Sequence, residues 1–375
     1  MTPSDSQLVA HFESITADCE FGFLQRLCNA EPIGLLRFAG VPLEGLTRAL
    51  RTRFAGIAVP DSVLLSTWDD EYRVHIENFG FLYHTEMLEG VVSVEQLRHL
   101  ECAKIRILTS RLIEQLESGT KIFVYQQREP MLAQELVRLL SALSIYRRAV
   151  LLWVVEAGAD SKPGTVEVIS ERLMVGHLQS FAPPGEAHKP DIESWLAVCR
   201  AAYEAWLAAQ AVSLPRQTAA GADQDGGAFI SDDTLISEFV FASGGNGLSF
   251  LADGWWSYPE YGFIWSVGRQ SRLILPNDAG GGDMLLELLV RPFVTPALPA
   301  QRMTIVANGR EIVTFRLTRE SRLHCPISVE PGAPIDIVFD HPDAARVADV
   351  MPSPDNRVLA VAFSRIWLYR TGNGR

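Results

Sequence analysis

The stretch Asp253–Gly268, which reads DGWWSYPEYGFIWSVG, holds three of the eight tryptophans of the chain. Tyrosine and phenylalanine lie between them, so aromatic residues are far denser here than the 9% of the whole sequence. Rings packed this closely need either a protein core or a flat apolar ligand to cover them. The C–H face of a sugar ring is such a ligand. The stretch therefore predicts a β-sandwich core rich in aromatic rings, with glycan contact as the alternative use of some of them.

The chain around and beyond this stretch has an almost purely β pattern. Short runs of alternating apolar residues recur between Pro and Gly turns, and Asn308–Gly309 is a strong hairpin signal between two of them. We expect strands at Ser271–Pro276, Met284–Val290, Met303–Val306, Ile312–Leu317, Leu323–Val329, Ile335–Phe339 and Val358–Leu368. Regular short strands of this kind predict an all-β sandwich or jelly roll over residues 229–375.

The first 207 residues alternate helical and strand patterns instead. Val94–Glu117 has apolar residues at a helical period, whereas Lys121–Gln126 and Ala149–Val155 are short continuous apolar runs typical of buried strands. Further helices are expected at Leu43–Phe54, Met131–Leu143 and Asp191–Leu207, and edge strands at Val166–Ser170 and Leu173–Val175. We expect an α/β domain with a mixed sheet over residues 1–207. A small, polar, Gly-rich segment over residues 208–228 predicts a linker.

Composition narrows the function classes. The chain has 375 residues and a formal net charge of -12, which fits two domains and disfavours binding to nucleic acid or to anionic lipid. The start lacks a basic and apolar leader pattern, and no apolar run approaches the roughly 20 residues of a membrane span. The five cysteines are scattered without CxxC or zinc spacing, and the histidines lack HxH or HxxxH spacing. We therefore expect a cytoplasmic protein with reduced thiols and with neither metal nor cofactor.

Cys19 is the first candidate for chemistry. It lies in SITADCEFGFLQRLC, where a thiol in the first turn of a helix has its ionised form favoured by the helix dipole. The neighbouring Asp18 and Glu20 oppose this effect, because nearby negative charge raises the pKa of a thiol. A buried structural thiol is the alternative that local chemistry favours.

Four segments resemble a bacterial family classed as papain-like cysteine peptidases: SITADCEFGFLQRL, EPIGLLRFAGVPLEGL, NFGFLYHTE and the helix and strand ending in KIFVYQ. The resemblance covers about residues 12–206 and implies a papain-like fold with Cys19 as nucleophile and His84 as general base. The family has a Pro-Phe-Asp-Trp-like segment where this chain reads LLRFAG around Arg37, so an acidic group is missing there.

A Cys–His pair also needs a third, orienting group. The sequence leaves that group open among Asp69, Asp70, Asn78 and Glu86. Arg37 and Asn78 are candidates for holding the oxyanion or orienting the substrate, and pairing of Arg37 with Glu31 is the alternative for the arginine.

The segment GWWSYPEYGFIWSVGRQSRLILP resembles a Trp-rich β-sandwich module that accompanies bacterial glycosyltransferases and polysaccharide-assembly proteins. The resemblance covers about Phe229–Tyr369 and implies a carbohydrate-binding-like jelly roll that is usually not catalytic. The matching residues are Gly254, Trp256, Ser257, Pro259, Glu260, Gly262, Trp265, Ser266, Gly268, Asn308, Gly309, Asp355, Arg357 and Leu359.

Within this module we expect Trp265 in the core and Trp255 and Tyr258 exposed, where their rings would stack on sugar. Glu260 and Arg357 would then hydrogen-bond sugar hydroxyls. A salt bridge between Asp355 and Arg357 that fixes the last strand is the alternative.

Three functional hypotheses follow. The first is a cytoplasmic protein of bacterial cell-surface polysaccharide biology, in which the sandwich binds a glycan or glycoconjugate and Cys19 and His84 form a thiol hydrolase or acyltransferase site. The second is a non-catalytic carbohydrate-binding or scaffold protein, with polysaccharide-assembly proteins as partners. The third is a glycosyltransferase-like enzyme, although the sequence shows no DxD motif at a strand end and no nucleotide-binding glycine loop.

Overall fold

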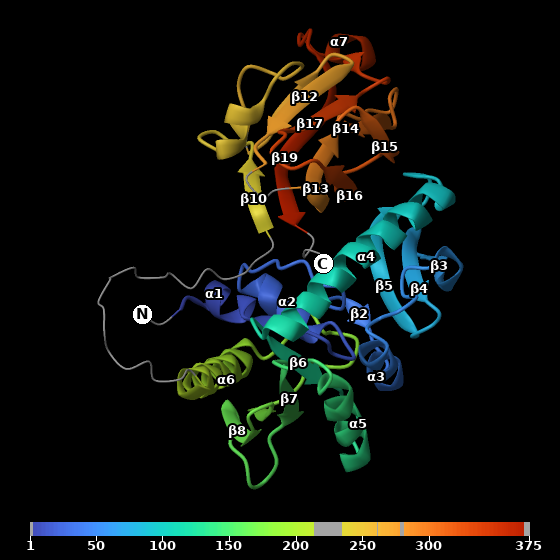
Figure 1. The fold of residues 1–375 in the computed structure, drawn as a ribbon. Helices are drawn as coiled ribbons and strands as arrows, with labels where there is room; N and C mark the ends of the chain where they lie inside the picture. The colour runs from blue at the N-terminus through green and yellow to red at the C-terminus, as the bar shows by residue number, and fades with distance from the viewer. Residues whose placement is uncertain (1–2, 214–234, 261, 278–280, 371–375) are drawn as a thin grey trace. The chain divides into compact units, whose positions relative to one another are not determined.

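The computed structural model describes residues 3–213, 235–260, 262–277 and 281–370 (Figure 1). The chain forms two compact units. The first unit comprises Met1–Ile57, Ile76–Tyr83 and Arg111–Asp233. The second comprises Ala58–His75, His84–Ser110 and Thr234–Arg375.

A five-stranded mixed sheet organises the first unit. Its strands are β1 (Phe12–Ser14), β6 (Ile122–Gln126), β7 (Val150–Glu156), β9 (Leu173–Leu178) and β8 (Thr165–Ser170), in that order across the sheet. The first four run parallel, and β8 pairs antiparallel with β9. All five residues of β6 are buried, as expected for a parallel strand that is covered on both faces.

Helices supply that cover. The helices that lie wholly in the first unit are α1 (Asp5–Ala10), α2 (Glu20–Leu27), α3 (Leu43–Arg51), α5 (Ala133–Leu143) and α6 (Ile192–Ser213). Leu8 of α1, Phe21 of α2 and Trp195 of α6 pack in one apolar cluster with Ile122 and Val124 of β6. The alternate residues of β6, Phe123 and Tyr125, are also fully buried. The sheet is therefore enclosed on its second face as well.

The second unit contains a β-sandwich, which confirms the predicted all-β architecture. One sheet has the order β10 (Leu235–Val240), β19 (Val358–Arg370), β13 (Gly282–Pro292) and β16 (Ser321–Val329), with β11 (Ile264–Val267) and β18 (Ala345–Arg346) also paired to β19. The other has the order β12 (Gln270–Leu275), β17 (Ile335–Asp340), β14 (Gln301–Ala307) and β15 (Arg310–Leu317). The short helices η2 (Asn246–Phe250) and α7 (Val347–Val350) lie in its connections.

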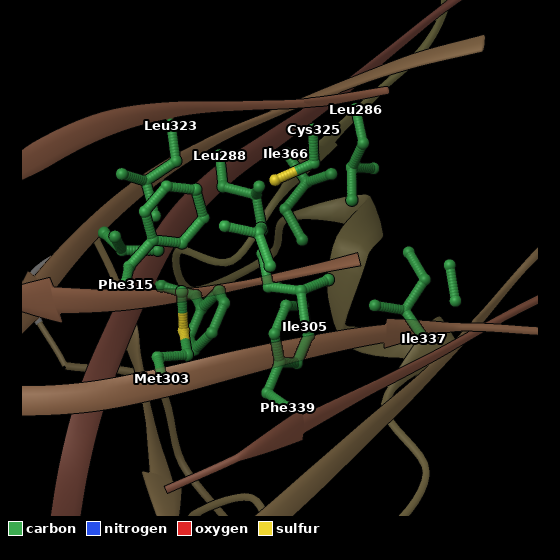
Figure 2. Close-up of a cluster of buried hydrophobic side chains, with 14 of the residues drawn as sticks. Leu286, Leu288, Met303, Ile305, Phe315, Leu323, Cys325, Ile337, Phe339 and Ile366 are labelled. Atoms are coloured by element: carbon green, nitrogen blue, oxygen red, sulfur yellow. The ribbon is translucent and has the colours of Figure 1, made fainter. Parts of the chain in front are cut away.

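The two sheets enclose one apolar core. Leu286 and Leu288 of one sheet point toward Met303, Ile305 and Phe339 of the other (Figure 2). The predicted hairpin at Asn308–Gly309 is confirmed. Both residues have positive φ values of 50° and 78°, and Ala307 pairs with Arg310 across a two-residue turn.

Residues 58–110 depart from the expected domain boundaries. They contain η1 (Pro60–Ser62), most of a small sheet with the order β2 (Ala39–Gly40), β5 (Phe81–Leu88), β4 (Glu71–Ile76) and β3 (Val63–Trp68), and the start of α4 (Val94–Ser118). Tyr72, Met87, Val91 and Leu97 belong to the same buried cluster as the sandwich core. Most of this segment therefore groups with the second unit, although we expected it in a domain of residues 1–207.

The expected linker also begins later than predicted, because α6 continues through Ser213. Residues 214–228 of that linker lie outside the described part of the chain. Among the described helices, none is long and apolar enough to cross a membrane.

Candidate functional site

The Trp-rich stretch of the second unit divides its rings between the core and the surface. Trp255 packs against the core, with its ring 5.0 Å from Phe363 and stacked at 6.4 Å on Phe241. Its indole Nε1 donates a hydrogen bond of 2.7 Å to the carbonyl oxygen of Arg272. The expectation that Trp255 is an exposed sugar platform is therefore wrong. Because its polar edge is bonded and its faces are in contact, this ring is part of the architecture.

The neighbouring Trp256 lies under a cluster of charges. The guanidinium carbon of Arg357 is 4.9 Å from the centroid of the Trp256 ring. Arg357 Nε and Nη2 donate to Asp355 at 2.8 and 2.6 Å, and Nη1 donates to Glu260. The hydrogen bonds from Arg357 lower the pKa of Asp355, and those bonds in turn raise the pKa of Arg357.

Glu260 and Arg357 therefore bind each other, whereas we expected each of them to bind sugar hydroxyls. The alternative, a salt bridge of Asp355 and Arg357 at the start of the last strand, is what the structure shows. The cluster fixes the loop before β11 against the segment before β19.

Tyr258 is the exposed ring of this loop. Its side chain is 73% exposed, as predicted, and it lies between Trp256 and Glu260 in the sequence. The expectation that Trp265 lies in the core is wrong, because its ring is half-buried and lies outside the buried cluster of the sandwich. It makes edge contacts with Phe263 at 5.7 Å and Phe293 at 6.1 Å and so packs the loop. Tyr261 lies outside the described residues. Among the described residues of the loop, Tyr258 is thus the exposed ring, and it lies close in sequence to Glu260 of the ionic cluster.

The first unit has its own cluster at the carboxyl ends of β1 and β6, the edge at which open parallel sheets bind ligands. Glu20 is fully buried at the start of α2. Its carboxylate accepts hydrogen bonds from Trp195 Nε1 at 2.9 Å, from the backbone N–H of Ala182 at 3.0 Å and from Gln126 Nε2 at 3.3 Å. Burial raises the pKa of Glu20 despite these donors. Sequence analysis missed this network because its members are as much as 175 positions apart.

Cys19 sits beside this network, at the N-cap position of α2. All five cysteines are among the described residues, and Cys19 alone is not buried. Its pKa is raised to about 11, mainly by desolvation and further by the charge of Asp18. A thiol with this pKa is protonated near neutral pH, which is the reverse of what an activated nucleophile needs.

His84, the predicted general base, is exposed on β5, and its Nδ1 is 3.2 Å from Glu71 Oε2. It belongs to the second unit, whereas Cys19 belongs to the first. The catalytic pair of Cys19 and His84, and with it the papain-like assignment, therefore stays a prediction.

Arg37 and Asn78 have structural partners. Arg37 is 5% exposed and donates to Glu31 at 2.6 Å and to the carbonyl oxygens of Gly22, Ala30 and Pro32. The alternative of pairing with Glu31 is what the structure shows, and an oxyanion role for Arg37 is corrected accordingly. Asn78 Nδ2 donates to the carbonyl oxygen of Gly56 at 3.3 Å. Within the described ranges, no group of three or more His, Cys, Asp or Glu side chains is arranged to hold a metal ion.

Comparison with known proteins gives limited similarity. No family model matches the chain, and no curated protein matches it. Solved carbohydrate-binding modules are among the similar structures. The C-terminal CBM6 of LamC, a marine laminarinase from Zobellia galactanivorans, is 9% identical with a TM-score of 0.24, and the match covers 36% of this chain and 98% of that one.

Two further structures are similar at the same level. A CBM36 module in complex with calcium and xylotriose is 10% identical with a TM-score of 0.18, covering 32% of this chain and 91% of that one. The exo-β-1,3-galactanase from Phanerochaete chrysosporium is 12% identical with a TM-score of 0.23, and the match covers 36% of this chain and 29% of that one. Similarity this low assigns neither a fold nor a ligand, so the sandwich is established by the strands of this chain alone.

Proposed function

We propose that the second unit is a glycan-binding module of bacterial cell-surface polysaccharide biology and that its binding loop is centred on Tyr258. The observation that carries the proposal is the 73% exposure of Tyr258 beside the cluster of Arg357, Asp355 and Glu260. A tyrosine side chain presents an apolar ring with a polar tip, and this combination suits contact with a ligand that has both apolar faces and hydroxyl groups. Because the ionic cluster holds the loop in place, the ring is presented with little conformational entropy to lose on binding.

The test is binding of the full chain to immobilised neutral polysaccharides. Tyr258→Ala should lower the affinity about tenfold, because truncation of an aromatic residue at the centre of a contact typically costs more than about 1 kcal/mol. Tyr258→Phe should retain most of the affinity, since it keeps the ring. Ile274→Ala, which removes another exposed apolar side chain of the sandwich, is the matched control. A wild-type chain that binds none of the polysaccharides would refute the proposal.

A thiol-dependent reaction at Cys19 is the second candidate function. It is favoured by the position of Cys19, which is the one accessible thiol and lies at the ligand-binding edge of a parallel sheet. The raised pKa of Cys19 argues against a resting thiolate, because burial, and to a smaller extent the charge of Asp18, disfavours the ionised thiol.

Alkylation by iodoacetamide tests this second candidate. If Asp18 suppresses the thiolate, Asp18→Asn should increase the labelling rate of Cys19 at pH 8 several-fold, because it removes the nearby charge. Cys19→Ser identifies which labelled peptide carries the signal. An unchanged rate in Asp18→Asn, combined with labelling no faster than that of the four buried cysteines, would exclude a reactive Cys19.

A further inference from the structure

The five-stranded sheet of the first unit has one open edge. Its two edge strands are β1 and β8, and the three residues of β1 are all buried. β8 is six residues long, and five of these residues are exposed. Among the described strands, β8 pairs with β9 alone, so alternate backbone N–H and C=O groups of β8 point away from the sheet. An edge of this kind is a template for a further strand.

The exposed strand is nevertheless held in place. Val166 is half-buried and packs on the apolar cluster that includes residues of α6. At the start of the strand, the backbone N–H of Gly164 donates a 2.7 Å hydrogen bond to the carbonyl oxygen of His177. A bulge between Val168 and Ser170 interrupts the pairing with β9, so the regular part of the edge ends at Val168. An added strand therefore meets a preformed edge, which lowers the entropic cost of binding.

The side chains of β8 differ between its two faces. Val166 and Val168 belong to the face that packs on α6, whereas Glu167 lies on the opposite face, because successive residues of a strand alternate. Val168 is 58% exposed and Glu167 is exposed as well. An added strand consequently places every second side chain beside Val168 and the others beside Glu167.

The charges around β8 restrict the class of partner. Three acidic side chains, Asp160, Glu167 and Glu171, are exposed in residues 160–171, against one basic side chain, Lys162. The nearby Arg172 directs its guanidinium to backbone carbonyl oxygens of its own unit. Antiparallel pairing with a second copy of β8 would bring two Glu167 carboxylates close to the two-fold axis, where like charges destabilise the pair. A strand with basic side chains opposite Glu167 avoids this repulsion.

We propose that β8 binds an extended peptide segment in which apolar and basic residues alternate. The apolar side chains of the partner lie beside Val168, its Lys or Arg side chains lie beside Glu167, and main-chain hydrogen bonds extend the sheet by one strand. This site belongs to the first unit, so it does not depend on glycan binding by the second.

The test is a fluorescence anisotropy titration of the full chain with labelled peptides. Val-Lys-Val-Lys-Val should bind about tenfold more tightly than Val-Glu-Val-Glu-Val, because favourable charge pairs replace unfavourable ones. Two further forms of the lysine peptide carry backbone N-methyl groups, on the valines in one and on the lysines in the other. One of these two forms should lose binding and the other should keep it, since only alternate N–H groups of an added strand face β8.

Glu167→Lys should reverse the preference, so that the glutamate peptide binds more tightly than the lysine peptide. A reversal is a gain of binding, which misfolding does not produce. Glu129→Lys makes the same change of charge at another exposed position of the first unit and should leave the preference unchanged.

Several results would overturn the proposal. Equal binding of the lysine and glutamate peptides would remove the role of charge, and equal binding of the two N-methylated forms would remove the role of the backbone. No saturable binding of either peptide would exclude the site. If the wild-type chain sediments as a dimer and Val168→Lys as a monomer, a second copy occupies the edge instead of a basic peptide.

Discussion

Arg357 and Glu260 are ion-paired although they are 97 positions apart in the sequence. The pair joins the Trp-rich loop to the segment that leads into β19, and Asp355 binds the other edge of the same guanidinium. The planar guanidinium group of arginine is required here, because the two carboxylates bind different edges of it at the same time. The Trp-rich loop is therefore held in position by the Arg357 guanidinium.

Arg357→Ala should destabilise the second unit by about 1–2 kcal/mol, because it leaves two half-buried carboxylates without their cation. Arg357→Lys should recover only part of this loss, since an ammonium group cannot bind both edges. Urea unfolding measures the effect. The control is Arg291→Ala, which breaks an exposed pair with Glu320 and should cost less than about 1 kcal/mol. Equal losses in the two variants would show that the Arg357 cluster is an ordinary surface ion pair.

Trp255→Ala should lower the stability of the second unit by about 3 kcal/mol or more, because it removes a ring packed on Phe241 and Phe363 and leaves the carbonyl of Arg272 without its donor. Tyr258→Ala should change stability by less than about 0.5 kcal/mol, since the ring is mostly in solvent. Thermal unfolding of the two variants measures the difference. Trp255→Ala with native stability and no glycan binding would return Trp255 to the role of a platform.

The adjacent residues Trp255 and Trp256 show how much of the sandwich could be predicted from the sequence. Alternation of apolar residues predicted most sandwich strands, because inward residues of a strand recur at every second position. It could not decide which of Trp255 and Trp256 faces inward, since that depends on non-local pairing. Gly254 has a φ of 79°, and a side chain there would meet the carbonyl oxygen of Gln270 at 1.9 Å. This close approach sets the turn and directs Trp255 to the core.

The assignment of residues 58–110 was beyond sequence reasoning for a similar reason. Local periodicity gives the helix from Val94 and the strands around Asn78–Gly80, but it does not say which core they join. Tyr72, Met87 and Leu97 join the sandwich core through contacts with residues far along the chain.

His341 should make the sandwich sensitive to acid. It is fully buried, its Nε2 lies 3.1 Å from Ser271 Oγ, and burial lowers its pKa from 6.5 to about 4, against the opposing charge of Asp340. The unfolded chain therefore binds a proton at a higher pH than the folded chain does. Stability is fully present above pH 6.5 and is lost as pH falls toward 4, by a total on the order of 3 kcal/mol.

Urea unfolding at pH 7.5 and 4.5 measures this loss. His341→Gln should reduce the difference between the two pH values, because the substituted residue does not titrate. His99→Gln removes an exposed histidine of the same unit and should leave the difference unchanged. The same pH dependence in His341→Gln as in wild type would mean that other groups cause the acid sensitivity.

The hydrogen bond between Trp195 and Glu20 should make the stability of the first unit depend on pH as well. Trp195→Phe removes the indole donor 2.9 Å from a fully buried carboxylate oxygen and should cost about 1–3 kcal/mol. The indole hydrogen bond lowers the pKa of Glu20, so its loss raises that pKa beyond the increase that burial already causes. A carboxyl group whose folded pKa is raised contributes stability below its unfolded pKa and loses it as pH rises through the folded value. The loss in free energy of unfolding caused by Trp195→Phe should therefore be larger at pH 7.5 than at pH 4.5.

Trp206→Phe is the matched control for that variant. Trp206 lies on the same helix, α6, and its ring is tilted against that of Tyr203 at 5.9 Å, so its substitution trims a ring of the same type without removing a hydrogen bond to Glu20. The loss in free energy of unfolding caused by Trp206→Phe should be similar at the two pH values, because this substitution mainly removes apolar contacts. If Trp195→Phe and Trp206→Phe show the same pH dependence in urea unfolding, the indole of Trp195 does not determine the ionisation of Glu20. A deficit that grows with pH in Trp195→Phe alone assigns the effect to the hydrogen bond between these two residues.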